Sequence, residues 1–181
     1  FFTVSYVALA AFVGAFADRL PKGKVMFVSN TIKVGGCLMM LFGMDPLIAY
    51  AVVGLGAAAY SPAKYGILTE YLPHSRLVAA NGWIEGLTVG SIILGTVLGG
   101  LLIAPKVSGF LLGIDVPGIE TIIDTPAEIA ISIVTAVYLI AAVFNLFIPG
   151  TGVPLKALPS NPWDTVKDFS SCCMRLWRDK L

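Results

Sequence analysis

Three ionisable side chains interrupt the long apolar runs of this sequence, and their chemistry needs an explanation. Lys33, Lys64 and Glu85 each lie within a stretch of otherwise apolar or small residues. A charge inside a membrane is costly unless it is paired, and such a residue by default marks a binding or translocation pathway. The sequence therefore predicts that these three residues either pair with one another or meet a ligand.

The spacing of the three residues places them at similar depths. Lys64 lies ten residues before His74 and Glu85 lies eleven after it, so two antiparallel helices rising about 1.5 Å per residue would carry both to about 15 Å from the turn. Lys33 lies twelve residues beyond Pro21, at about 18 Å. Lys64 and Glu85 could form a fixed ion pair. Lys33 could pair with Glu85, with a helix outside this sequence, or with a substrate.

The residues around Glu85 form a second pattern. Asn81, Glu85 and Thr88 fall on one stripe of a helix, which we expect to face a cavity rather than lipid. Small residues recur every four positions on the same segment, and this spacing suits close helix packing. We expect helix contacts at Gly82, Gly86, Gly90, Gly95 and Gly99.

The elements that must position these residues are membrane helices. The 181 residues are 57% hydrophobic and 13% charged, about half the charge of a soluble domain. The sequence predicts an all-α multi-span membrane protein, with a bundle over 1–148. Five segments approach the length needed to cross a bilayer. The predicted spans are about 1–17, 25–42, 47–72, 77–103 and 126–148. A loop over 104–124 separates the last two, and Thr125 and Glu128 form a capping box at the start of the last one.

The cations indicate how the spans are oriented, because cytoplasmic loops are enriched in Lys and Arg. The loop 18–24, the turn 73–76 and the tail 149–181 are basic, whereas the alternate loops are not. We therefore place these three segments in the cytoplasm. In the tail, apolar and polar residues alternate with a helical period over about 162–179. This amphipathic helix would lie in the membrane interface or pack on the protein as part of a linker.

The first loop carries a recognisable pattern. Gly14, Asp18 and Arg19, followed by Lys22 and Lys24, resemble the signature between the second and third helices of the major facilitator superfamily. The resemblance implies a conformational-switch loop, with Gly14 and Asp18 as a latch between two halves of a carrier. Asp18 would need a partner there, either Arg19, Lys22 or a helix N-terminus of the other half.

The stretches at 54–72 and 79–100 narrow the resemblance. GLGAAAYSPAKYGILTEYL and AANGWIEGLTVGSIILGTVLGG are similar to the bacterial lysophospholipid transporter branch of that superfamily. The resemblance implies an inner-membrane fragment holding helices two to six and the start of the central linker, without the first helix and the C-terminal half. It implies alternating access that supplies lysophospholipids for reacylation by an acyltransferase, with Lys33 or Lys64 attracting the substrate phosphate.

Two other classes of function compete with lysophospholipid transport. A superfamily antiporter or uniporter for a small polar metabolite or drug is the main alternative. An enzyme is not expected, because His74 is the only histidine and no nucleophile has a motif relationship to it. No pattern predicts a metal site, a cofactor or a nucleic acid partner, and membrane lipid is the expected surroundings.

Overall fold

The computed structural model describes residues 13, 17, 20–113, 125–150, 152 and 162–178, and every regular element among them is an α-helix. The helices are α2 (Lys22–Leu41), α3 (Pro46–Tyr71), α4 (His74–Ile103), α5 (Pro105–Leu112), α6 (Pro126–Leu146) and α7 (Pro162–Arg178). Within this part of the chain four helices, α2, α3, α4 and α6, are long and apolar enough to cross a membrane. The predicted all-helical, multi-span class is confirmed. The predicted span 1–17 lies outside the described residues, positions 13 and 17 excepted.

Two prolines make α2 and α4 begin earlier than predicted. Pro21 and Pro73 each precede a helix with an extended backbone, at ψ 131° and 152°. Proline cannot donate a backbone hydrogen bond, so it is readily placed at the boundary where helix donors are unsatisfied. Lys22 and Lys24 therefore lie in the first turn of α2, and His74 opens α4. The predicted loop 18–24 therefore ends at Pro21 and the predicted turn 73–76 ends at Pro73, so Lys22, Lys24 and Arg76 lie on helices.

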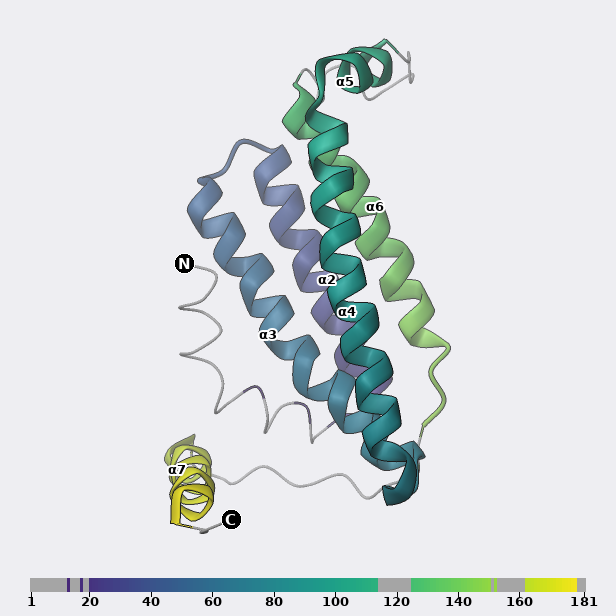
Figure 1. Cartoon of the computed structure of the whole chain (residues 1–181). Helices are drawn as coiled ribbons and strands as arrows, with labels where there is room; N and C mark the ends of the chain where they lie inside the picture. Colours follow the sequence, from purple (N-terminus) through teal and green to yellow (C-terminus); the bar gives the residue numbers. More distant parts are fainter. Residues whose placement is uncertain are drawn as a thin grey trace.

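The predicted loop 104–124 contains a helix that the sequence analysis missed. α4 ends at Ile103, Ala104 is extended, and α5 starts at Pro105. A residue before proline is driven out of the helical region by the proline ring, which explains the break at Ala104. Pro105 then occupies the first helical position, where its missing N–H costs nothing. α5 lies across the end of the bundle in Figure 1.

The starts of α3 and α6 follow from their capping residues. Asp45 accepts hydrogen bonds from the backbone nitrogens of Leu47 and Ile48, at 2.8 and 3.4 Å, after a tight turn in which Gly43 has φ +72°. The predicted capping box of α6 is confirmed. The Thr125 nitrogen donates to Glu128 Oε2 at 2.8 Å, and the Glu128 nitrogen donates to Thr125 Oγ1 at 3.3 Å.

The packed part of the molecule is centred on α2, which contacts both α3 and α6. Two glycines allow α3 to approach α2 closely. A Cβ at Gly36 of α2 would lie 2.6 Å from Val53 Cγ2, and a Cβ at Gly56 of α3 would lie 2.7 Å from the Ser29 carbonyl oxygen. Both glycines therefore lie at close approaches between α2 and α3. Val25 and Met26 of α2 form a buried apolar cluster with Ala63 of α3.

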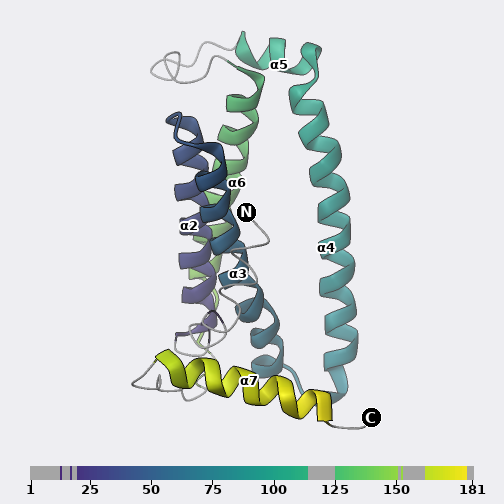
Figure 2. The ribbon, with the colours of Figure 1, turned by 90° about the vertical axis from the view of Figure 1, so that its left-hand side faces the viewer.

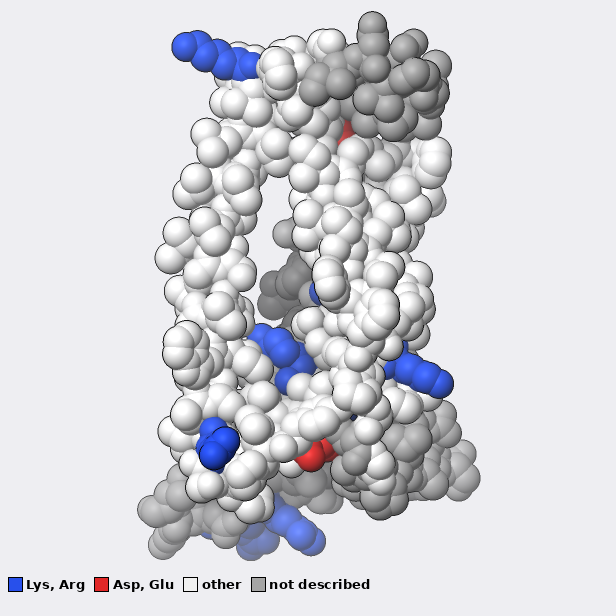
Figure 3. Space-filling view, turned by 90° about the vertical axis from the view of Figure 1, so that its right-hand side faces the viewer, with Lys and Arg blue, Asp and Glu red and all other residues white. Residues whose placement is uncertain are grey.

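α4 stands apart from this packed part. It runs alongside α3 and α6 but is separated from them over much of its length (Figure 2), and none of its 30 residues is buried. Figure 3 shows an opening between α4 and the rest of the bundle. The same view shows Lys and Arg side chains gathered mainly in the lower half, the end where α2 begins and α3 ends. α7 also lies at that end (Figure 2).

Candidate functional site

The polar residues of α3 and α4 meet across a narrow seam. Lys64 Nζ donates a hydrogen bond to Thr88 Oγ1 at 3.1 Å, and the Thr88 hydroxyl donates to the backbone oxygen of Ile84 at 2.7 Å. The hydroxyl therefore accepts from the ammonium and donates within its own helix. The sequence placed Lys64 at the level of Glu85, whereas it contacts Thr88, which lies about one helical turn farther from His74 on the same stripe of α4.

Tyr65 connects Lys64 to Glu85, and the sequence analysis did not identify it. The Tyr65 hydroxyl donates to Glu85 Oε1 across the seam. The ring of the same tyrosine lies 4.6 Å from Lys64 Nζ, within the range of a cation–π contact. A tyrosine beside a lysine at the edge of an apolar helix gives no distinctive signal, because the partner carboxylate lies twenty residues away.

Lys64 and Glu85 do not form the ion pair that the sequence left open. Within the described ranges, the one ion pair joins Lys22 and Glu70, and Lys64 instead contacts Thr88 and the Tyr65 ring. Glu85 lies one helical turn from Thr88 on α4 and is exposed. The seam therefore holds an ammonium over the Tyr65 ring and a carboxylate at the hydroxyl of the same tyrosine.

Lys33 occupies a different environment within α2, α3 and α6. Its side chain is 9% exposed, and Nζ donates to Asn30 Oδ1 at 3.2 Å. The same atom lies 4.4 Å from the centre of the Tyr60 ring and 5.2 Å from that of Tyr138. Two aromatic rings and an amide thus surround the cation where the sequence analysis expected a carboxylate or a substrate. A single sequence cannot reveal this arrangement, because the three partners come from three helices.

Gly56 provides the space for this lysine. A Cβ at Gly56 would lie 2.7 Å from Lys33 Cγ, so any larger residue would displace the stem of the side chain. Contacts under 3.0 Å are essentially never adopted by real Cβ atoms. The glycine therefore lets α2 and α3 approach with Lys33 between them.

Only part of the predicted switch loop is described. Gly14, Asp18 and Arg19 lie outside the described residues. Lys22 is largely buried, donates to the Ala17 carbonyl oxygen at 2.8 Å and lies 3.6 Å from Glu70. Lys24 is exposed. Lys22 therefore joins the start of α2 to the end of α3.

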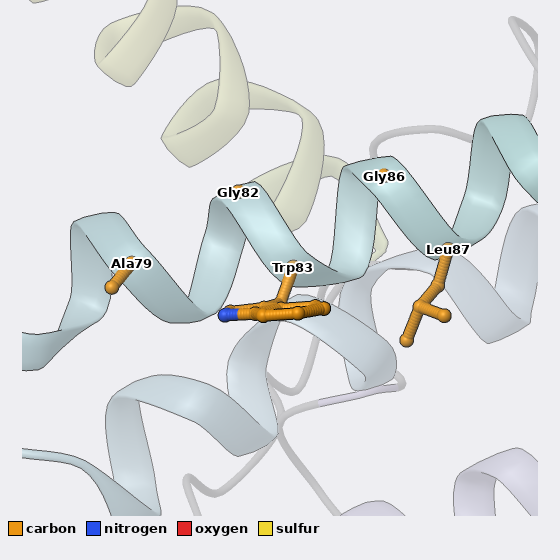
Figure 4. A pocket seen from close by; sticks show the side chains of 5 residues that line it. All are labelled: Ala79, Gly82, Trp83, Gly86 and Leu87. Carbon is orange, nitrogen blue, oxygen red and sulfur yellow. The ribbon is translucent and has the colours of Figure 1, made fainter.

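The glycines of α4 meet no neighbour in the described part of the chain. A Cβ at any of Gly82, Gly86, Gly90, Gly95 and Gly99 would find no atom within 4 Å. Their predicted packing role therefore stays a prediction. Asn81 is also exposed. The start of α4 instead lines an open hollow of about 480 Å³, with the side chains of Trp83 and Leu87 on one side of the helix and Gly82 and Gly86 on the other (Figure 4).

No group of three or more metal-ligating side chains occurs among the residues whose placement is described. The arrangement is that of a polar seam between membrane helices. Its chemistry is the attraction of ions and dipoles, since an ammonium, a hydroxyl, a phenol and a carboxylate converge there.

Comparison with known proteins gives two findings. Residues 1–161 match the family model described as Major Facilitator Superfamily. The chain is 40% identical over 178 residues to the lysophospholipid transporter LplT of Yersinia enterocolitica serotype O:8 / biotype 1B, and 39% identical to the proteins of that name from Yersinia pestis (strain Pestoides F) and Yersinia pseudotuberculosis serotype O:3 (strain YPIII). Each alignment covers 98% of this chain and 39% of the relative, so the chain spans about two fifths of their length. No solved structure matches the chain significantly.

Proposed function

Because the chain belongs to the major facilitator superfamily, we propose that it supplies part of the N-terminal half of a transporter that flips lysophospholipids across the bacterial inner membrane. The observation that carries this proposal is the 40% identity, over 98% of the chain, to a protein named as a lysophospholipid transporter. Family membership also favours a transporter over an enzyme. In the complete protein, the helix before this chain and the C-terminal half would enclose the substrate path.

The seam between α3 and α4 supplies a group suited to the substrate. A lysophospholipid carries a phosphate, and an ammonium is a compact cation that attracts such an anion. Among the described residues Lys64 contacts only the Thr88 hydroxyl and the Tyr65 ring, so its three donors are not all used. We therefore assign Lys64 the phosphate. Thr88, Asn81 and Glu85 line the same side of α4 and would contact the rest of the headgroup.

Lys33 is the second candidate for binding the phosphate, but its surroundings favour this role less than those of Lys64 do. Its ammonium already has Asn30 and two tyrosine rings around it, and its side chain is largely buried. A phosphate would have to displace these partners. Lys33 would reach the substrate only in a different arrangement of α2, α3 and α6.

The remaining elements of the proposal concern sidedness and mechanism. The end of the bundle where α2 begins and α3 ends would face the cytoplasm, in agreement with its basic residues. Transport would proceed by alternating access around a site near the middle of the membrane. The lipid delivered there would be reacylated by an acyltransferase on the cytoplasmic side.

Uptake of radiolabelled lysophosphatidylethanolamine by spheroplasts that express the complete protein tests this proposal. We expect uptake in the wild type and at least about tenfold less in Lys64→Ala, because a hydrogen bond to a charged group contributes about 1.5–3 kcal/mol. Lys106→Ala, on exposed α5, is the matched control and should transport at the wild-type rate. Uptake by Lys33→Ala is compared with uptake by Lys64→Ala, and we expect the larger loss in Lys64→Ala.

Two outcomes would contradict the proposal. Wild-type uptake in both Lys64→Ala and Lys33→Ala would remove the phosphate role from both lysines. An absence of lysophospholipid uptake, together with transport of a soluble metabolite, would favour the antiporter or uniporter alternative. Competition by glycerophosphoethanolamine, which has the headgroup but no acyl chain, would show whether the headgroup alone is recognised.

A further inference from the structure

The helix α7 has no packing partner among the other described helices. α2 to α6 contact one another in several pairs, whereas α7 (Pro162–Arg178) takes part in none of them. It appears end-on in Figure 1 and lengthwise in Figure 2, so its axis runs across the bundle rather than along it. It lies at the end of the bundle that carries most of the basic side chains. A helix in this position would lie parallel to the membrane plane.

The exposed side chains of α7 divide into two kinds. Phe169, Met174 and Trp177 are all exposed, and Trp177 is 92% exposed. A large aromatic side chain is among the residues that gain most from leaving water, and tryptophan is enriched at membrane interfaces. The apolar side of α7 therefore needs a covering that the described helices do not supply.

The basic residues of α7 border this apolar side. At 100° per residue, Lys167 and Arg178 lie only about 20° apart around the helix, and Met174 lies about 20° from Lys167. Long basic side chains at such a border can bury their stems while the charge stays at the headgroups. Arg175 lies on the opposite, polar side of the helix, between Asp164 and Asp168 around the helix axis. Two of the three cations are thus placed for a negatively charged surface next to an apolar layer.

We propose that α7 binds the anionic lipid surface of the membrane leaflet at this end of the bundle, with Phe169, Cys173 and Trp177 at the acyl boundary and Lys167 and Arg178 at the lipid phosphates. The helix does not span the membrane, because its 17 residues contain five charges and its length is about 26 Å. An anionic bilayer matches the apolar arc, its basic border and the orientation of α7 across the end of the bundle. This surface is distinct from the transport seam between α3 and α4.

Two adjacent cysteines provide the means to test the proposal. Cys172 and Cys173 are both exposed and lie about 100° apart around α7, so one faces the polar side while the other faces the apolar side. In the complete protein, Cys37 and any cysteine outside this chain are replaced by alanine, and a nitroxide is attached to Cys172 or Cys173 while the other is replaced by serine. Each labelled protein is reconstituted in vesicles of phosphatidylcholine with about one third phosphatidylglycerol. Collision of the nitroxide with oxygen, which enters the bilayer, is compared with collision with a water-soluble nickel chelate.

At Cys173 we expect frequent collision with oxygen and little with the nickel chelate, and at Cys172 we expect the reverse. Low accessibility to both reagents at Cys173 would mean that α7 packs on protein, and high nickel accessibility there would mean that it lies in water. Either result would overturn the proposal. The result is independent of whether the protein transports lysophospholipid, so it separates this inference from the proposed function.

The basic border is tested with charge variants. Lys167→Gln with Arg178→Gln should raise nickel accessibility at Cys173, because each basic residue near an anionic surface contributes to binding. Pure phosphatidylcholine vesicles should have the same effect on the wild type. Arg175→Gln is the matched control and should leave the nickel accessibility at Cys173 unchanged. Equal accessibility in all variants and both vesicle types would overturn the anionic preference.

Discussion

The helices α2 and α4 are both long enough to cross a membrane, yet they meet the rest of the described chain in opposite ways. Ten of the 20 residues of α2 are buried, including Ser29, Asn30 and Lys33, whereas none of the 30 residues of α4 is. The difference also separates two sets of glycines. Gly36 and Gly56 are pressed against neighbouring atoms, and Gly82 and Gly86 are not. A small-residue spacing therefore permits a close contact without specifying where the contact occurs.

The largest expected effect comes from closing the space at Gly56. Gly56→Ala would place a Cβ 2.7 Å from both Lys33 Cγ and the Ser29 carbonyl oxygen, so α2 and α3 would have to move apart. We expect a loss of about 1–3 kcal/mol in the free energy of unfolding, which is typical of overpacking. Thermal unfolding of the complete protein in detergent measures it.

Gly86→Ala is the matched control for that substitution, because it also adds one methyl group to a membrane helix. No described atom lies within 4 Å of the added carbon, so stability should not fall, and it should rise by up to about 1 kcal/mol from helix propensity. If Gly86→Ala destabilises the complete protein as much as Gly56→Ala, then α4 packs against a segment beyond the described residues. The comparison between α2 and α4 would then hold only for this part of the protein.

An effect near the middle of the range for Gly56→Ala is expected from removing the cation between the tyrosine rings. Lys33→Ala would leave a cavity between α2, α3 and α6 and would expose Tyr60 and Tyr138 to it, with a loss of about 2 kcal/mol. Lys33→Met fills most of the same space with an apolar chain and should lose less than about 1 kcal/mol, because a neutral side chain avoids the cost of a buried charge. Unfolding midpoints of the two variants test this order.

The opposite order, with Lys33→Met less stable than Lys33→Ala, would show that the charge itself holds the three helices together. In that case the cation–π contacts would contribute more than the packing of the stem. Wild-type stability in both variants would contradict the close packing of α2 that distinguishes it from α4.

The sequence predicted well what depends on single helices. The apolar runs located α2, α3, α4 and α6, and Thr125 with Glu128 located the start of α6, because these features involve residues that are close in the chain. It missed α5, which begins at Pro105 inside the predicted loop, and it began the fourth span at 77, whereas α4 begins at His74 directly after Pro73.

The candidate site could be predicted only in part, for a related reason. Helical geometry placed Lys64 at the level of Glu85, whereas the structure brings it to Thr88, about one helical turn farther along the same stripe of α4. The choice of partner depended on side-chain reach, since Tyr65 reaches Glu85 before Lys64 does. The contacts of Lys33 were harder still to predict, because its partners Tyr60 and Tyr138 come from helices whose relative rotation the sequence does not reveal.

The smallest expected effect concerns the seam that ties α4 to α3. Tyr65→Phe keeps the ring beside Lys64 but removes the hydroxyl that binds Glu85. A hydrogen bond of this kind contributes about 1 kcal/mol, so we expect a fall of about fivefold in lysophospholipid uptake as Lys64 loses its fixed position. Spheroplast uptake at equal expression measures it, and Tyr71→Phe is the control, because that hydroxyl binds the Pro149 carbonyl oxygen away from the seam. Unchanged uptake in Tyr65→Phe would mean that α4 is held in place by contacts other than this seam. An equal fall in Tyr71→Phe would mean that the loss does not depend on the position of Lys64.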